Sequence, residues 1–112
     1  MRVFKFGGAS VKDAAGVRNV YDVLQKVGYE DVLLVVSAMG KTTNALEVVI
    51  KNYFEKSKEL QASVQEVKKY HNEIMMDLFE DEKHLVFKNV TTLFAELEYF
   101  LNHNKSPNYN FV

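Results

Sequence analysis

Hydrophobic and polar residues divide the chain into two halves that follow different periodicities. Residues 1–44 hold all five glycines and the β-branched runs, whereas no glycine interrupts the chain from Lys41 to Ser106. That second stretch consists of good helix formers with apolar residues three or four positions apart. We therefore expect an α/β half that contains the glycines, followed by a long helical half.

The first half predicts a strand, a helix and a second strand. Residues 2–6 have a strand pattern, and Asp13 is a candidate N-cap for a helix that Gly28 would end. This helix would bury a stripe of apolar residues from Val17 to Val27. Residues 31–36 hold the continuous apolar run from Val32 to Val36, which is typical of a strand buried on both faces. Two strands joined by a helix make a βαβ unit, so we expect them to be parallel with a right-handed crossover.

The second half predicts three helices, of which the last two are expected to form an antiparallel hairpin. The acidic run from Glu80 to Glu82 separates these two helices, and the chain from Asn102 onward is expected to be a loop. The stripes that carry these predictions are Leu46, Val49, Ile50 and Tyr53; Leu60, Val64, Val67, His71, Ile74 and Leu78; and Val86, Val90, Leu93 or Phe94, Leu97 and Leu101.

Composition and charge narrow the class of protein. Of the 112 residues, 47% are hydrophobic and 26% are charged, which is typical of a globular domain. The net charge is −1 and acidic and basic residues alternate along the chain, so we expect no nucleic-acid partner. No apolar run approaches the length needed to cross a bilayer, so we expect no membrane partner. The chain has no cysteine, and His71, His84 and His103 lack metal-ligand spacing, so no metal site is expected. Because the strand pattern begins directly after Met1, we expect no signal peptide and a cytoplasmic protein.

Two adjacent glycines follow the first predicted strand, in the segment Lys5-Phe6-Gly7-Gly8-Ala9-Ser10-Val11. Gly7 and Gly8 would let the backbone approach a ligand closely and direct N–H groups at an anion. The dipole of the following helix, the Lys5 charge and the Ser10 hydroxyl would favour phosphate further. The alternative is a surface lysine beside an ordinary glycine turn.

A second polar segment, Ser37-Ala38-Met39-Gly40-Lys41-Thr42-Thr43-Asn44, follows the second strand. Open α/β sheets bind ligands at the carboxyl ends of their parallel strands, so both segments would face one crevice. The alternative is that Thr42, Thr43 or Asn44 only caps the next helix. Gly40-Lys41-Thr42 also resembles the end of a P-loop. That pattern requires a glycine where the chain has Val35, inside a strand, so we reject the P-loop interpretation.

Together the two segments resemble the aspartokinases of the amino-acid kinase family. Lys5, Gly7, Gly8, Ser10 and Val11 match the opening motif of the family, and Ser37, Gly40, Thr43 and Asn44 match its second motif. Ala9 departs from the family, which usually has threonine there. The resemblance implies an α/β fold, the amino-terminal part of an amino-acid-kinase-like αβα sandwich. Residues 1–44 would be the βαβ unit with the nucleotide and substrate loops, 45–104 a helical subregion and 105–112 a truncated tail.

The resemblance also implies an enzyme activity, the ATP-dependent phosphorylation of the β-carboxylate of L-aspartate, which begins lysine, threonine and methionine biosynthesis. Its small-molecule partners would be ATP, used with Mg²⁺, and L-aspartate. The family implies that Lys5 is catalytic and that Lys5, Gly7, Gly8 and Ser10 bind the ATP phosphates. It implies that Ser37 and Thr43 lie near the aspartate. These residue types suit phosphoryl transfer, which depends on positioning and positive charge.

Other parts of an aspartokinase are absent from these residues, among them a serine-x-glycine-glutamate motif and the regulatory ACT domains. We therefore expect a fragment that does not turn over alone. Because a two-stranded parallel sheet leaves faces and edges uncovered, we also expect a homo-oligomer. Two alternatives remain: another carboxylate kinase of the same family, and a non-catalytic helical domain that self-associates through its hairpin.

Overall fold

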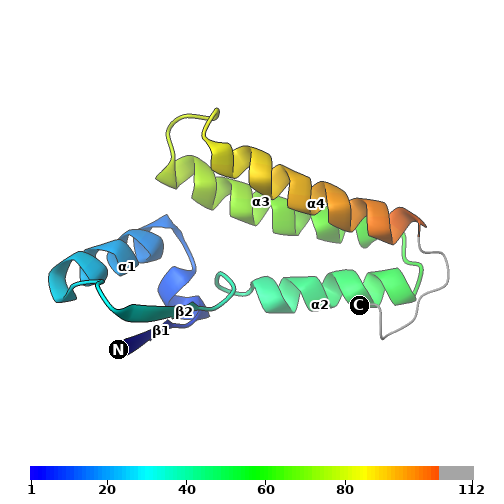
Figure 1. Ribbon diagram of the computed structural model, residues 1–112. Helices are drawn as coiled ribbons and strands as arrows, with labels where there is room; N and C mark the ends of the chain where they lie inside the picture. Colours follow the sequence, from blue (N-terminus) through cyan, green and yellow to red (C-terminus); the bar gives the residue numbers. More distant parts are fainter. Residues whose placement is uncertain (104–112) are drawn as a thin grey trace. The chain divides into compact units, whose positions relative to one another are not determined.

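The computed structural model describes residues 1–103, which form a mixed α/β, mostly helical chain with one two-stranded parallel sheet (Figure 1). The chain divides into two compact units, one comprising Met1–Thr43 and the other beginning at Asn44. The α/β half and the helical half expected from the hydrophobic pattern therefore fold as separate clusters of contacts. The predicted tail, residues 105–112, lies outside the described residues.

The first unit contains the predicted strand, helix and strand. Strand β1 spans Arg2–Phe6, helix α1 spans Ala14–Val27 and strand β2 spans Val32–Val36. The two strands are parallel and run in register from the pair Arg2 and Val32 to the pair Phe6 and Val36. The βαβ prediction is confirmed in its elements and in the direction of its strands. One element was not predicted, the 3₁₀ helix η1 at Gly8–Val11, which forms where a simple glycine turn was expected.

Both ends of α1 carry the predicted caps. The Asp13 carboxylate accepts a hydrogen bond from the Gly16 N–H at 2.8 Å, which satisfies one of the free amides of the first turn. At the other end, Gly28 has a φ of 85° and donates its N–H to the Leu24 carbonyl at 2.9 Å. This left-handed φ is the reason a glycine ends the helix. The Arg2 guanidinium donates to the Val27 and Gly28 carbonyls at 3.0 and 3.3 Å, and so ties β1 to the end of α1.

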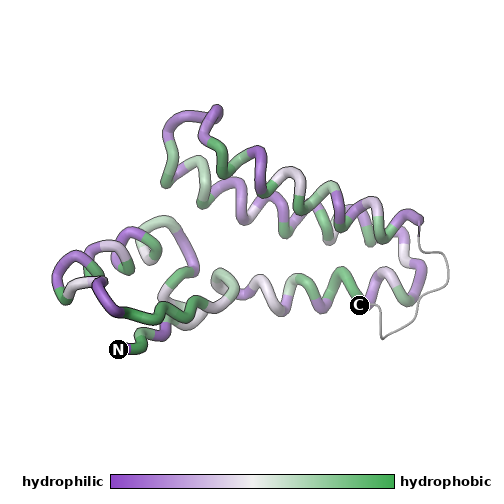
Figure 2. Tube along the Cα trace, in the orientation of Figure 1, coloured by the Kyte–Doolittle hydropathy of each residue, from purple (hydrophilic) through white to green (hydrophobic). Residues whose placement is uncertain are grey.

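Burial in the first unit differs from the sequence prediction in two places. Val27, expected in the buried stripe of α1, has 43% of its surface exposed. Strand β2, expected to be buried on both faces, is exposed at Leu33, Leu34, Val35 and Val36. Figure 2 shows β2 as a continuous hydrophobic segment. The prediction was wrong for this structure. An apolar run indicates that a strand favours burial on both faces, but among the described residues only β1 pairs with β2.

The second unit is built on helices at the predicted positions. Helix α2 spans Thr42–Phe54, α3 spans Leu60–Leu78 and α4 spans Leu85–His103. The expected loop from Asn102 onward was therefore wrong for Asn102 and His103, which continue α4. Helices α3 and α4 lie side by side as the predicted antiparallel hairpin (Figure 1), joined by an ion pair of 3.0 Å between Lys68 and Glu98. The buried core between the helices consists of Val49, Tyr53, Val64, Val67 and Leu101, with Ala45, Leu46, Phe54, Leu60, Phe94, Leu97 and Phe100 packed around it.

The half-buried histidine of α3 has a packing role. The Nδ1 atom of His71 lies 2.8 Å from the Val67 carbonyl oxygen, which can only accept, so His71 donates this hydrogen bond. Its ring meets the Phe94 ring edge-on, with 6.1 Å between the centroids.

Among the described residues, no group of three or more histidine, aspartate or glutamate side chains has the arrangement of a metal site. No helix within residues 1–103 has both the length and the apolar character that crossing a membrane requires.

Candidate functional site

The two predicted ligand segments leave the sheet at the same edge. Strands β1 and β2 end opposite each other at Phe6 and Val36. The ladder continues for one more residue, because the Ser37 N–H donates to the Phe6 carbonyl at 3.0 Å. Gly7 and Ser37 therefore begin two neighbouring loops at the carboxyl ends of parallel strands, as the sequence predicted. In open α/β sheets this edge is the usual place for a ligand.

A direct hydrogen bond joins the two loops. The Gly40 N–H donates to the Gly8 carbonyl at 3.0 Å. A Cβ atom on Gly8 would lie 2.8 Å from the Gly40 carbonyl oxygen and 3.2 Å from that of Ala38. Both neighbours are backbone atoms, which cannot turn aside as a side chain can. Gly8 is therefore required by the close approach of the two loops themselves.

Gly7 has different surroundings from Gly8. Its backbone is extended, with φ −77° and ψ 174°, a conformation that any residue can adopt. A Cβ atom built on Gly7 would meet nothing within 4 Å. The packing of the described chain thus gives no reason for a glycine at this position. An approaching ligand would give one, because a missing side chain lets a bound group reach the backbone.

The remaining predicted site residues lie on the surface of the same unit. Lys5 is exposed, and among the described residues its ammonium group has no ion-pair or hydrogen-bond partner. Ser10 is exposed in η1, where its N–H donates to the Gly7 carbonyl at 3.0 Å. The Ser37 hydroxyl donates to the Ala38 carbonyl at 3.2 Å. Thr43 is exposed in the first turn of α2. Lys5 thus precedes one loop, and the other residues lie on or next to the two joined loops.

The alternative that Thr43 or Asn44 caps helix α2 does not fit the observed start of the helix. Its first residue is Thr42, so Thr43 and Asn44 lie inside the first turn and do not occupy the cap position. Thr42 is buried, with 6% of its surface exposed, and its N–H donates to the Met39 carbonyl at 2.9 Å. Capping by Thr43 or Asn44 therefore does not account for these two residues.

Gly16 packs closely against the first loop, a role that the sequence did not predict. A Cβ atom on Gly16 would overlap the carbonyl oxygen of Ser10, so the glycine lets α1 approach η1 closely. The available signal was a glycine inside a helical pattern, which costs helix stability and therefore suggests a packing reason. Val35 lies within β2, in agreement with the rejection of a P-loop.

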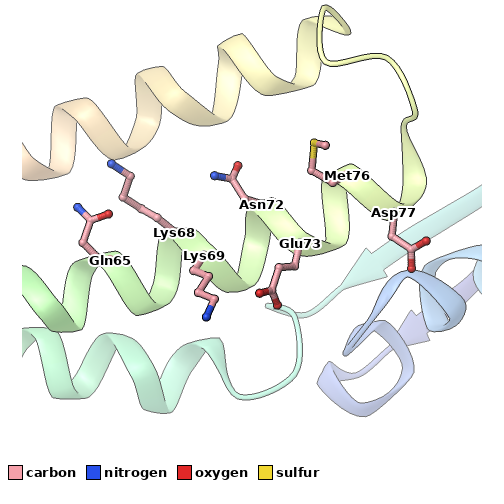
Figure 3. Close-up of a pocket in the computed structure, with 7 residues that line it drawn as sticks. All are labelled: Gln65, Lys68, Lys69, Asn72, Glu73, Met76 and Asp77. Carbon is pink, nitrogen blue, oxygen red and sulfur yellow. The ribbon is translucent and has the colours of Figure 1, made fainter.

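A surface hollow lies outside the glycine loops (Figure 3). It follows one side of α3, and all of its lining residues come from that helix. It contains none of the residues predicted to bind ATP or aspartate, and its two lysines and two acidic residues give it no net charge. We therefore assign the candidate site to the glycine loops. The lining residues of the hollow are Gln65, Lys68, Lys69, Asn72, Glu73, Met76 and Asp77.

Comparison with known proteins gives a partial similarity to an aspartokinase. No protein-family model matches the chain. Over 44 residues, the chain is 48% identical to the aspartokinase 1, chloroplastic, of Arabidopsis thaliana. The matched stretch is 39% of this chain and 8% of the plant protein. The similarity thus indicates a relation to aspartokinases over a short segment. Because the plant protein is named as chloroplastic, a cytoplasmic location for this chain stays a prediction.

Proposed function

We propose that the chain is the amino-terminal part of an aspartate kinase catalytic domain with the amino-acid kinase fold. The reaction is the transfer of a phosphoryl group from ATP to the β-carboxylate of L-aspartate, giving 4-phospho-L-aspartate and ADP. The observation that carries this proposal is the joining of two motif-bearing loops by the Gly40–Gly8 hydrogen bond at the carboxyl ends of β1 and β2. The 44-residue similarity to a plant aspartokinase also supports it.

The first loop supplies what a bound triphosphate requires. Phosphate oxygens approach the backbone at Gly7, where the chain leaves open space, and the Ser10 hydroxyl is exposed beside it. The ammonium group of Lys5 provides the positive charge that stabilises negative charge on the phosphates during transfer. Gly8 contributes indirectly, because it holds the second loop against the first. Lys5 is therefore the residue of this chain on which the reaction rate depends most.

The second loop is assigned to the binding of the phosphoryl acceptor, L-aspartate. Ser37 and Thr43 offer hydroxyl groups for hydrogen bonds to L-aspartate, whose β-carboxylate oxygen attacks the γ-phosphorus while the bond to ADP breaks. A carboxylate is a nucleophile at neutral pH, so the step needs no strong general base. None of the proposed site residues carries a carboxylate. Mg²⁺ would consequently be held mainly by ATP phosphate oxygens and water, without a carboxylate from these site residues.

Calorimetry on the isolated chain is the first test. MgATP is titrated into the purified protein, with and without L-aspartate. Binding that disappears in Lys5→Ala and persists in Lys26→Ala, a matched exposed lysine at the end of α1, supports the proposed site. Binding that survives unchanged in Lys5→Ala contradicts the role of this lysine.

Turnover requires the remainder of a catalytic domain, so a chimera provides the decisive test. The chain replaces the part of the Arabidopsis enzyme that contains the similar 44-residue segment, and the acyl phosphate is trapped with hydroxylamine as a hydroxamate. We expect hydroxamate formation that Lys5→Ala reduces by about 100-fold or more while leaving the circular dichroism spectrum unchanged. A folded chimera that binds both substrates and forms no hydroxamate rejects the kinase proposal.

A non-catalytic, self-associating helical domain is the second candidate, and one observation favours it. Helix α4 exposes large apolar side chains at Leu85, Leu93 and Tyr99, which self-association could cover. In this interpretation, the glycine loop only joins secondary-structure elements. Lys5→Ala would then change neither self-association nor any ligand affinity, whereas the kinase proposal requires a loss of nucleotide binding.

A further inference from the structure

The second loop turns sharply at Gly40, directly before helix α2. The Thr42 N–H donates to the Met39 carbonyl at 2.9 Å, which closes a four-residue β-turn with Gly40 at its second position. Gly40 has a φ of 52°, in the left-handed region. Turns with a positive φ at this position are formed mainly by glycine, asparagine and aspartate, because most other side chains clash with the backbone there. The path of the second loop therefore depends on the residue type at position 40.

The same turn holds the contact between the two loops. The Gly40 N–H donates to the Gly8 carbonyl at 3.0 Å, and Gly40 is half-buried. Along the chain, Gly40 lies between Ser37 and Thr43, the two residues assigned to L-aspartate. On the other side of the contact, Gly8 follows Gly7, where the open space is assigned to the ATP phosphates. A backbone hydrogen bond thus connects the proposed nucleotide loop to the turn that places the proposed acceptor residues.

The two loops have little space between them, so the contact can transmit movement. A Cβ atom on Gly8 would lie 2.8 Å from the Gly40 carbonyl oxygen and 3.2 Å from that of Ala38. Both neighbours are backbone atoms, so the first loop cannot move toward the second without displacing it. Beyond the turn, the second loop continues into α2, whose first residue, Thr42, is buried. Movement of Gly8 is therefore passed to Gly40 and is not absorbed by a flexible side chain.

We propose that Gly40 is a positioning residue that couples the binding of nucleotide and of L-aspartate, so that each ligand raises the affinity for the other. This proposal rests on the function proposed above. Either ligand, once bound, holds its own loop in one conformation, and the contact between Gly40 and Gly8 holds the other loop with it. The second ligand then binds to a loop that is already ordered, and less conformational freedom is lost. The effect is reciprocal, because a coupling free energy changes both affinities by the same factor.

Calorimetry on the chimera measures this coupling without turnover. The β,γ-imido analogue of ATP is titrated with Mg²⁺ in the absence and presence of saturating L-aspartate, and L-aspartate is titrated with and without the analogue. We expect each ligand to lower the dissociation constant of the other by about 5-fold or more. In Gly40→Ala, the added methyl group opposes the left-handed φ, and the factor should fall below about 2.

Two variants separate the turn at Gly40 from general destabilisation. Gly40→Asn should retain most of the coupling, because asparagine accepts a positive φ more readily than alanine. Asparagine is also larger than alanine, so this order cannot result from lack of space. Gly28→Ala strains another glycine of positive φ, 85°, which precedes the amino end of β2, whereas both loops leave the carboxyl ends of the strands. It should destabilise the first unit and keep the coupling. Full coupling in Gly40→Ala, or an equal loss in Gly40→Ala and Gly28→Ala, overturns the proposal.

The outcomes distinguish this proposal from the proposed function. A folded chimera to which either ligand fails to bind rejects the proposed function, and this proposal with it. A chimera that binds the two ligands independently overturns the coupling alone. Amide hydrogen exchange needs no variant, since the Gly40 amide should exchange more slowly when either ligand is bound by itself. An exchange rate that either ligand leaves unchanged would overturn the role of Gly40 even if Gly40→Ala does not fold.

Discussion

Gly7 and Gly8 are adjacent glycines of one motif, yet alanine should have opposite effects on stability at the two positions. At Gly8, a Cβ atom would lie 2.8 Å from the Gly40 carbonyl oxygen and 3.2 Å from that of Ala38. At Gly7, it would meet nothing within 4 Å, and the backbone is already in an extended conformation open to alanine. The two substitutions add the same methyl group, so the difference between them reports the packing of the two loops.

The expected magnitudes follow from these distances. In Gly8→Ala, the second loop must move by roughly half an ångström to reach ordinary contact, and overpacking of this kind costs about 1–3 kcal/mol. Movement of the loop also weakens the hydrogen bond from Gly40 to Gly8, worth about 0.5–1.5 kcal/mol. In Gly7→Ala, alanine restricts the unfolded chain and stabilises the fold by about 0.4–1 kcal/mol. The two variants should therefore differ by about 2–4 kcal/mol.

Native-state hydrogen exchange at Ser37 measures this difference within the first unit. Its N–H donates to the Phe6 carbonyl at the point where the two loops begin. Exchange should be roughly 30- to 1,000-fold faster in Gly8→Ala than in Gly7→Ala, since about 1.4 kcal/mol corresponds to a factor of ten. Equal exchange rates in the two variants would refute the packing argument. In the chimera, Gly7→Ala should nevertheless weaken MgATP binding, because its methyl group occupies the space assigned to the phosphates.

Three further predictions concern the caps, the helical core and the hairpin. Asp13→Ala removes the acceptor for the Gly16 N–H and should destabilise α1 by about 0.5–2 kcal/mol. The loss should appear as faster hydrogen exchange of the Gly16 amide, and an unchanged exchange rate would contradict the cap. Val64→Ala, at a side chain 1% exposed, should cost about 2 kcal/mol in urea unfolding, whereas Leu93→Ala, 63% exposed, should change stability by less than about 0.5 kcal/mol. A double-mutant cycle with Lys68→Met and Glu98→Gln should give a coupling below about 1 kcal/mol that decreases in high salt; a coupling insensitive to salt would argue against a partly exposed ion pair.

Element type and order could be predicted from the sequence because each depends on a local periodicity. The stripe from Leu60 to Leu78 coincides with α3, and Asp13 and Gly28 are the caps that their residue types suggest. The 3₁₀ helix η1 was not predicted, because two glycines and a serine are equally compatible with a simple turn. The exposure of Val27 depends on which residues cover the end of α1, and no periodicity within α1 contains that information.

The candidate site was predictable in outline because parallel strands joined by a helix must end at the same edge of the sheet. That rule brings Gly7 and Ser37 to neighbouring loops. The different surroundings of Gly7 and Gly8 could not be predicted, because they depend on the path by which the second loop returns to the Gly8 carbonyl. Gly16 escaped prediction for the same reason, since its contact with Ser10 lies between two elements. The ligand roles of Lys5, Ser10, Ser37 and Thr43 stay predictions.

The exposed strand β2 has a physical requirement that the described residues do not meet. Its apolar run favours burial on both faces, and its outer backbone groups favour a further strand. The proposed function meets this requirement, because a complete α/β catalytic domain has further strands and helices that can cover β2. The amides of Leu34 and Val36 should therefore exchange more slowly in the chimera than in the isolated chain. Equal exchange rates in the two proteins would mean that the catalytic sheet does not extend from β2.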